Sequence, residues 1–163
     1  MPVKPIPDGY HTLTPFLTVR DASRAIDFYQ QAFGAQVRGG VAKDPDGKVM
    51  HAELKIGDSI IMLSDEYPEF GSLSPHSGGS TSMGLHIYVD DVDSAFARAV
   101  EAGAQVDMPL RDQFWGDRYG RLKDPFGHKW SLATHKADVS PEEMKRGVEE
   151  AFAQGAQKMQ KTA

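Results

Sequence analysis

Apolar and polar residues alternate along residues 11–19, which is the pattern of a β-strand with one buried face. One face carries Leu13, Leu17 and Val19, and the other carries Thr12, Thr14, Phe16 and Thr18. Asp21 then has the position of a helix N-cap, and apolar residues recur at helical spacing until Gly34, a residue typical of helix C-termini. The pattern predicts a strand, a helix and a stop.

Two or three further strands are predicted after this helix, around residues 35–41, 48–56 and 59–65. The segment Asp44-Pro-Asp-Gly47 favours a hairpin turn, and Gly57-Asp58 favours a tighter one. The first part of the chain is therefore expected to be a βαβββ module.

The same pattern occurs twice in the chain. The segments Thr14-Pro-Phe-Leu-Thr-Val-Arg-Asp21 and Gly34-Ala-Gln-Val37 recur as Gly84-Leu-His-Ile-Tyr-Val-Asp-Asp91 and Gly103-Ala-Gln-Val106. The repeat predicts a strand at 84–89, a helix capped by Asp91 and a last strand from Lys129 to His135; residues 107–123 are ambiguous. Ser140-Pro-Glu-Glu143 is a capping box that begins one more helix.

These patterns predict a single α+β domain over residues 1–163, in which two βαβββ modules form a curved mixed sheet with helices on its convex face. The first module covers residues 10–66 and the second covers 83–136. Residues 67–82, rich in Ser, Gly and Pro, are expected to be the linker, and residues 140–154 the C-terminal helix.

Composition narrows the classes of function. The net charge is −5 with both signs interspersed, which argues against a nucleic-acid partner. No apolar run reaches the roughly 18 residues of a membrane span, and the N-terminus lacks a signal-peptide pattern, so no membrane partner and a cytoplasmic location are expected. The absence of cysteine excludes disulfides, thiolate catalysis and Cys-ligated metals.

The strand face turned away from the helices is expected to line a pocket, because it gathers histidines, a carboxylate and aromatic rings. The expected lining consists of Thr12, Thr14, Phe16, His51, Glu53, Lys55, Met62, Ser64, Gly84, His86, Tyr88, Lys129, Ser131 and His135. For Phe16, Met62 and Tyr88 a core position is an open alternative, and for His51 and Glu53 an exposed strand face is. His128 is expected to be exposed.

The paired modules, the Val-Arg-Asp and Val-Asp-Asp segments before each helix, and Asp124-Pro-Phe-Gly-His-Lys-Trp130 resemble the vicinal oxygen chelate superfamily. That superfamily includes glyoxalase I, extradiol dioxygenases, and fosfomycin- and bleomycin-resistance proteins; Asp112–Gly120 and Ser140–Glu143 resemble an uncharacterised glyoxalase-like branch. The resemblance covers residues 10–136. It implies a concave sheet face that encloses a ligand, usually completed in a homodimer.

Metal-dependent members of that superfamily carry one metal ligand on the first strand and one on the last strand of each module. The matching positions here are Thr14, Met62, Gly84 and Ser131. None has an imidazole or carboxylate donor, so the resemblance predicts no metal at the usual site and no cofactor. A displaced site for a divalent metal, formed by His86, His51 and Glu53, is the alternative.

His86 and Glu53 are the candidate catalytic residues, since a histidine at this position can act as a general base or orient a ligand carbonyl. The alternative for His86 is a hydrogen bond within a polar cavity. Trp115 and Arg118 suit a loop over a small ligand, with a flat ring and a fork for carboxylate or phosphate. A turn in which Asp117 and Arg118 brace the module interface is the alternative.

The resemblance and the faces together predict a protein that binds a small organic molecule in a concave cavity. Its ligand-binding residues are Thr14, Phe16, His51, Met62, Tyr88, Trp115, Arg118 and Ser131. The sequence leaves open whether this protein is a lyase or isomerase or a non-catalytic sequestering protein. A metal-dependent lyase, isomerase or dioxygenase is a second possibility. A purely structural or regulatory dimer is a third.

Overall fold

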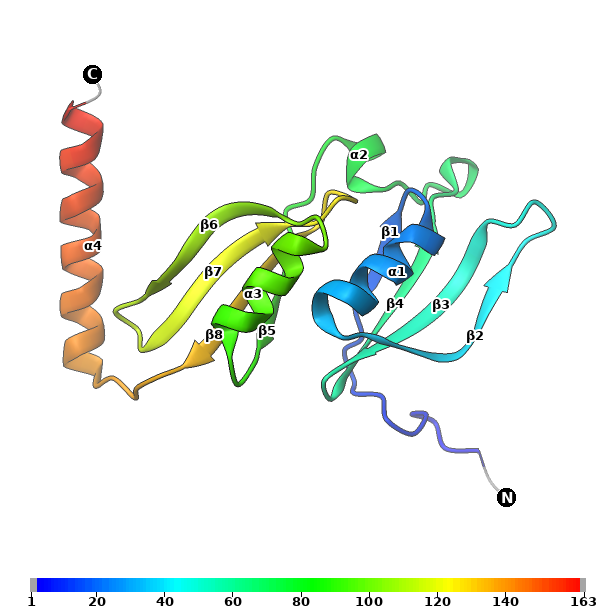
Figure 1. Cartoon of the computed structure of the whole chain (residues 1–163), viewed down its shortest axis with the longest axis horizontal. Coiled ribbons are helices and arrows are strands. Elements are labelled where there is room, and N and C mark those ends of the chain that lie inside the picture. The colour runs from blue at the N-terminus through cyan, green and yellow to red at the C-terminus, as the bar shows by residue number, and fades with distance from the viewer. Residues whose placement is uncertain (1–2, 162–163) are drawn as a thin grey trace.

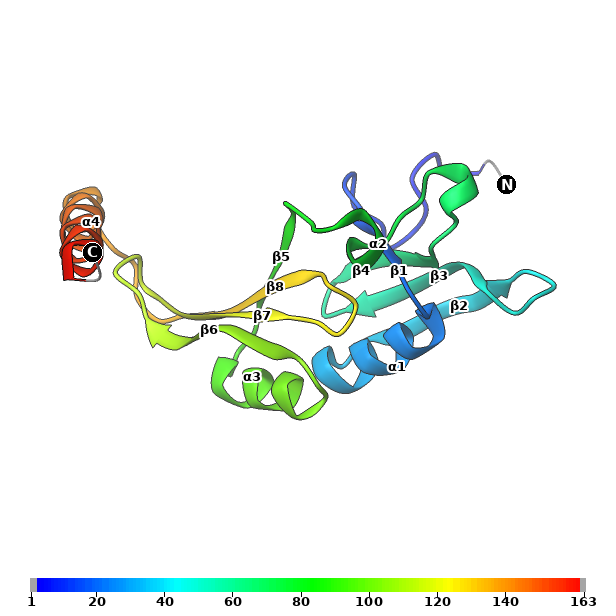
Figure 2. The ribbon, with the colours of Figure 1, turned by 90° about the horizontal axis from the view of Figure 1, so that it is seen from above.

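The computed structural model describes residues 3–161 of the chain, and the side chains of residues 3–154. Two four-stranded mixed sheets lie side by side, and helices α1 (Ala22–Phe33) and α3 (Val92–Glu101) cover the same side of both (Figures 1 and 2). Neither of these two helices covers the opposite faces of the sheets (Figure 2). The predicted α+β fold of two βαβββ modules is confirmed.

The first module begins with β1 (Phe16–Val19) and α1 (Ala22–Phe33), followed by β2 (Gln36–Lys43), β3 (Val49–Ile56) and β4 (Ser59–Asp65). Its strand order is β1-β4-β3-β2, with β1 parallel to β4 and the other pairs antiparallel. Asp21 caps α1 by accepting a bond from the Arg24 backbone N–H at 3.1 Å, and Gly34 ends it at φ 66°, as predicted.

The second module repeats this plan with β5 (Gly84–Tyr88), α3 (Val92–Glu101), β6 (Gln105–Asp112), β7 (Asp117–Lys123) and β8 (Lys129–His135). Its strand order is β5-β8-β7-β6. The connection between the modules contains a short 3₁₀ turn, η1 (Pro68–Phe70), and a single helical turn, α2 (Pro75–Gly78). The ambiguous residues 107–123 thus form most of a β6–β7 hairpin.

One strand prediction was wrong at its start. The strand expected from residue 11 begins only at Phe16, and Leu13, expected on the core face, is 86% exposed. Pro15 has no N–H to donate to a strand ladder, so residues before it leave the sheet. The alternation of apolar and polar residues does not by itself reveal this break.

The two modules share one hydrophobic core, which α1 and α3 close from one side. Asp124, in the β7–β8 turn, is only 3% exposed and accepts bonds from Tyr29 of the first module at 2.7 Å and from Trp130 at 2.8 Å. His128 was expected to be exposed, but it is 8% exposed because its Nε2 lies 3.0 Å from the Thr18 carbonyl oxygen across the module boundary.

The last helix, α4 (Pro141–Lys161), begins at the predicted capping box: Glu143 accepts from the Ser140 backbone N–H at 2.8 Å. It extends past the expected end at residue 154 and stands apart from both sheets (Figures 1 and 2). None of the helices within residues 3–161 combines the length and hydropathy that spanning a bilayer requires.

Candidate functional site

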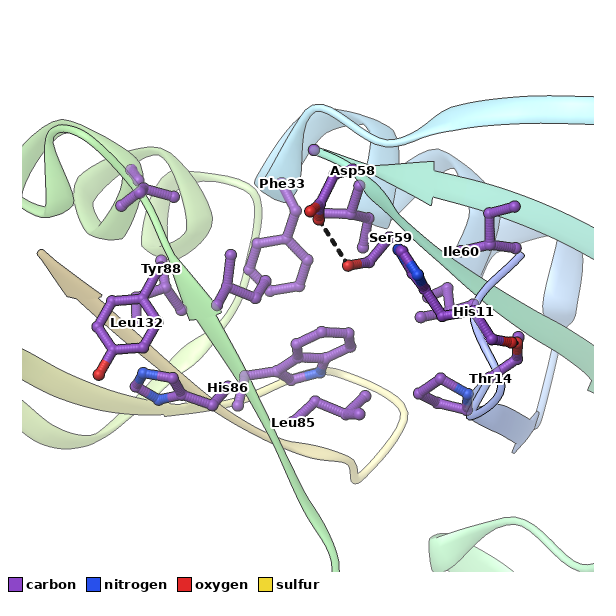
Figure 3. Close-up of a pocket in the computed structure, with 18 of the residues that line it drawn as sticks. His11, Thr14, Phe33, Asp58, Ser59, Ile60, Leu85, His86, Tyr88 and Leu132 are labelled. Atoms are coloured by element: carbon purple, nitrogen blue, oxygen red, sulfur yellow. Dashed lines mark hydrogen bonds between the residues drawn. The ribbon is translucent and has the colours of Figure 1, made fainter. Parts of the chain in front are cut away.

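A cavity of about 670 Å³ lies between the two modules, beside strand β5 (Figure 3). One wall is β5 itself, and the facing wall combines residues 11–15 with the turn between β3 and β4. Apolar side chains from the shared core complete it: Phe33, Ile61, Ala95, Trp130 and Leu132. Since β5 is an edge strand, residues from both of its faces reach this space.

His86 is the imidazole that β5 contributes to this cavity (Figure 3). The parallel register of β5 and β8 sets His86 directly beside Ser131, and its Nδ1 lies 2.7 Å from the Ser131 Oγ. Its ring stacks on Tyr119, with centroids 5.9 Å apart, and meets Tyr88 edge-on at 4.6 Å. Burial lowers the pKa of His86 despite the opposing charge of Asp117, and so favours the neutral form of the ring.

A buried carboxylate holds the aromatic residues beside His86. Asp117, at the start of β7 and 4% exposed, accepts bonds from the Tyr88 hydroxyl at 2.9 Å and the Trp115 indole N–H at 3.1 Å. Its other oxygen lies 2.8 Å from His135 Nδ1. Burial alone would raise the pKa of Asp117, but these three partners lower it instead. Tyr88 and Trp115 are therefore fixed by one anchor.

Asp117 and Tyr119 were not predicted as site residues. The signal that could have found them is the alternation along β7, where Asp117, Tyr119 and Arg121 share one face while Arg118, Gly120 and Leu122 share the other. Residues 107–123 were ambiguous between strand and loop. Their alternation could therefore not be assigned to the two faces of a strand.

Arg118 lies on the helix-covered side of β7 and not on the face that carries Trp115. Its guanidinium binds both carboxylate oxygens of Asp93, at 2.6 and 2.7 Å, and one of Asp112 at 3.2 Å. The Arg118 guanidinium, which was expected to bind a ligand, is thus occupied by Asp93 in the first turn of α3. Nor does Arg118 brace the module interface, as the alternative proposed, because its partners Asp93 and Asp112 belong to the second module, like Arg118 itself.

Four of the predicted residues lie on the open face of the first sheet, apart from the main cavity. His51 Nε2 is 3.5 Å from Glu53 Oε1, and the Phe16 ring lies 6.0 Å from the His51 ring. Glu53 and Met62 line a more open hollow of about 490 Å³, together with residues 5–12. A hydrogen bond from Tyr10 lowers the pKa of Glu53.

The structure thus divides the predicted set. The main cavity is lined by Thr14, His86 and Tyr88. Two further residues adjoin it through hydrogen bonds, Ser131 to His86 and Trp115 to Asp117. The first sheet carries the others, Phe16, His51, Glu53 and Met62.

The residues at the superfamily's metal positions do not fit a divalent metal. Thr14, Met62 and Gly84 offer no imidazole or carboxylate, and the Ser131 hydroxyl is engaged by His86. His86 stands on one sheet, while His51 and Glu53 stand on the other. Across the residues that the structure describes, no three His, Asp or Glu side chains are grouped so that they could hold a metal ion.

Comparison with known proteins gives matches along most of the chain. The family model of the Glyoxalase/Bleomycin resistance protein/Dioxygenase superfamily matches residues 10–132. An uncharacterized protein of Mycobacterium tuberculosis H37Rv, Rv0887c, is 47% identical over 139 residues, which are 83% of this chain and 81% of that protein.

Solved structures are similar as well. TioX from Micromonospora sp. ML1 matches with a TM-score of 0.60 and 30% identity, over 77% of this chain and 98% of that chain. The fosfomycin resistance protein FosX from Listeria monocytogenes, complexed with Mn(II) and sulfate ion, matches with a TM-score of 0.57 and 19% identity, over 83% of this chain and 96% of that chain. At that identity the FosX match shows a shared fold alone.

Proposed function

The chain belongs to the Glyoxalase/Bleomycin resistance protein/Dioxygenase superfamily, and from that premise we propose that it binds a small organic molecule in the cavity beside β5, without the usual divalent metal. The observation that carries the proposal is this cavity of about 670 Å³, which joins a largely apolar lining to the imidazole of His86. Sites for small organic ligands typically have this volume and this mixture of surfaces.

His86 supplies the polar contact to the ligand. Its Nδ1 is held by Ser131, which fixes the ring, and Nε2 has no hydrogen-bond partner among the described residues. A neutral imidazole fixed in this way can hydrogen-bond a ligand oxygen or take up a proton from the ligand. The proposal therefore covers both a sequestering protein and a metal-independent lyase or isomerase.

We also propose that the protein acts as a homodimer. The faces of both sheets opposite α1 and α3 expose large side chains, among them Phe16 at 48% and Tyr88 at 62%. A second copy that covers these faces would remove them from water. Size-exclusion chromatography with light scattering is expected to give the mass of two chains, and a monomer at micromolar concentration would contradict this part of the proposal.

A displaced metal site is the second candidate, and the specific observation in its favour is the His51–Glu53 pair, 3.5 Å apart on one face of β3. His86 lies on the other sheet of the same chain, so a site with all three needs a second copy. Stoichiometric zinc, iron or manganese in purified protein, lost in both His86→Ala and Glu53→Ala, would favour this candidate over the metal-free one.

The ligand proposal is tested by screening organic compounds for stabilisation in thermal unfolding, followed by calorimetric titration of each hit. His86→Ala is expected to weaken binding of a hit about tenfold, because one hydrogen bond and its ring contacts are lost. His76→Ala is the control, since His76 is exposed, lies outside the cavity and forms a hydrogen bond with the Pro125 carbonyl oxygen. Equal weakening in both variants, or no hits at all, would refute the proposal.

A further inference from the structure

The open face of the second sheet carries an excess of positive charge. His86, Ser131 and Arg121 form one row across β5, β8 and β7, and Lys129 and Lys123 form the next row. Arg111 of β6 stands opposite Tyr119 on the same face. The whole chain has a net charge of −5, so this local excess does not follow from composition.

Two of these cations face each other directly. Lys123 of β7 and Lys129 of β8 are partners in the antiparallel register, and both are exposed. Like charges that stand directly opposite on one sheet face destabilise the pair. Neither lysine takes part in an ion pair within the described side chains, whereas Arg121 lies 3.2 Å from Asp107. Local rules broken without a structural gain are typical of functional sites.

The space beside the lysines is open. The β5 partner of Lys129 is Gly84, which has no side chain to cover it. Lys129 stands two residues before Ser131 on β8, so the two backbone positions are about 7 Å apart. The row of the two lysines is thus next to the row that contains His86, and Tyr119 stands one row further along β7, with its ring 19° from parallel to the His86 ring.

We propose that the ligand is an organic anion with a flat aromatic body. Its carboxylate, phosphate or sulfonate group lies over Lys123 and Lys129, where it relieves their mutual repulsion. Its ring system packs against His86 and Tyr119 and extends toward the cavity beside β5. This inference rests on the proposed function and adds the chemical class of the ligand.

The test uses two fluorescent probes that share the same rings. 8-Anilinonaphthalene-1-sulfonate carries an anionic group, and N-phenyl-1-naphthylamine does not. The full chain is expected to bind the sulfonate probe about tenfold more tightly at low salt, with the preference falling as salt screens the lysines. 1-Naphthoate and 1-naphthyl phosphate are expected to displace it, and naphthalene-1-carboxamide is not.

Variants then assign the preference to the two lysines. The double variant Lys123→Gln with Lys129→Gln is expected to lose most of the preference and to keep its affinity for the neutral probe within about twofold. Lys123→Arg with Lys129→Arg is expected to retain the preference, because both charges remain. Lys43→Gln, which changes an exposed lysine on β2 of the first sheet, is the matched control and is expected to behave as the unmodified chain.

The outcomes separate the two proposals. If both probes bind equally and the double variant changes neither affinity, the anion inference is wrong and the small-molecule proposal stands. If neither probe nor any screened compound binds, the proposed function fails and the inference fails with it. A loss of affinity for both probes in the glutamine variant, together with a lowered melting temperature, would show a structural role for the lysines and overturn the inference.

Discussion

Two Asp-Pro-x-Gly turns occur in this chain, Asp44–Gly47 between β2 and β3 and Asp124–Gly127 between β7 and β8, and their local geometry is nearly the same. Each aspartate accepts bonds from the backbone N–H groups two and four residues later, at 2.8–3.0 Å. Each also accepts a tyrosine hydroxyl, from Tyr67 at 2.9 Å in the first turn and Tyr29 at 2.7 Å in the second.

The turns differ in their surroundings. Asp44 is half-buried and the rest of its turn is exposed, whereas Asp124 is 3% exposed, binds Trp130 as well, and connects the second module to α1 of the first. The comparison teaches that a four-residue motif determines its own backbone shape but not its contribution to stability. That contribution depends on how much water the surrounding structure excludes, because an unsatisfied buried donor costs far more than an exposed one.

The largest expected effect comes from replacing the two aspartates. Asp124→Asn leaves two buried side-chain donors and two backbone donors with a weaker acceptor, and we expect a loss of about 3 kcal/mol in the free energy of unfolding. Asp44→Asn is the same substitution in the more exposed turn, and it is expected to shift the urea midpoint only slightly. Equal shifts in the two midpoints would show that surroundings do not distinguish the turns.

The glycines of the two turns give the next test. Both have positive φ, 86° at Gly47 and 93° at Gly127, so alanine costs about 1 kcal/mol of backbone strain at either site. At Gly127 the new Cβ would also lie 2.9 Å from Pro75 Cβ, whereas at Gly47 it would meet nothing within 4 Å. Gly127→Ala is therefore expected to lose about twice as much unfolding free energy as Gly47→Ala.

A similar loss of unfolding free energy in both alanine variants, measured by urea unfolding, would mean that Pro75 moves away from the new Cβ without loss of stability. The Gly47 variant serves as the control, because it reports the strain of the positive φ alone.

The smallest expected effect is on the pH dependence of stability. Partial burial would raise the pKa of Asp44, but bonds from Tyr67 and from the Lys48 and Asp46 backbones lower it below 3.8. A carboxyl whose pKa is lower in the folded state stabilises the fold above its unfolded pKa, and this stabilisation is lost as pH falls through the folded value.

The difference in urea midpoint between the unmodified chain and Asp44→Asn is therefore expected to have its maximum value at pH 6 and a smaller value at pH 3. A difference that stays constant across this range would contradict the assigned hydrogen bonds.

Local patterns predicted the elements well because they act over a few residues. Asp21, Asp91 and Ser140 cap the helices as expected, and the strands expected after α1 match β2, β3 and β4 within two residues. The prediction failed for Leu13, where Pro15 interrupts the ladder, and for His128, whose partner Thr18 lies 110 residues away.

The candidate site was predicted only in part, for a related reason. Strand alternation identified the face that carries His86, Tyr88 and Ser131, and strand order then brought His86 and Ser131 together. Alternation could not tell that Arg118 points to α3, or that Asp117 anchors Tyr88 and Trp115, because the limits of β7 were ambiguous.

The sequence by itself determined the duplicated βαβββ plan, the helix caps, the turns and the absence of metal donors at the superfamily positions, since each depends on residue type and short-range spacing. The tertiary structure alone decided that Asp124 is buried while Asp44 is half-buried, that the cavity lies between the modules, and that Lys129 of β8 lies beside Gly84 of β5. These features depend on which strands become neighbours and on how α1 packs against α3, and they are decided by contacts between residues distant in the chain.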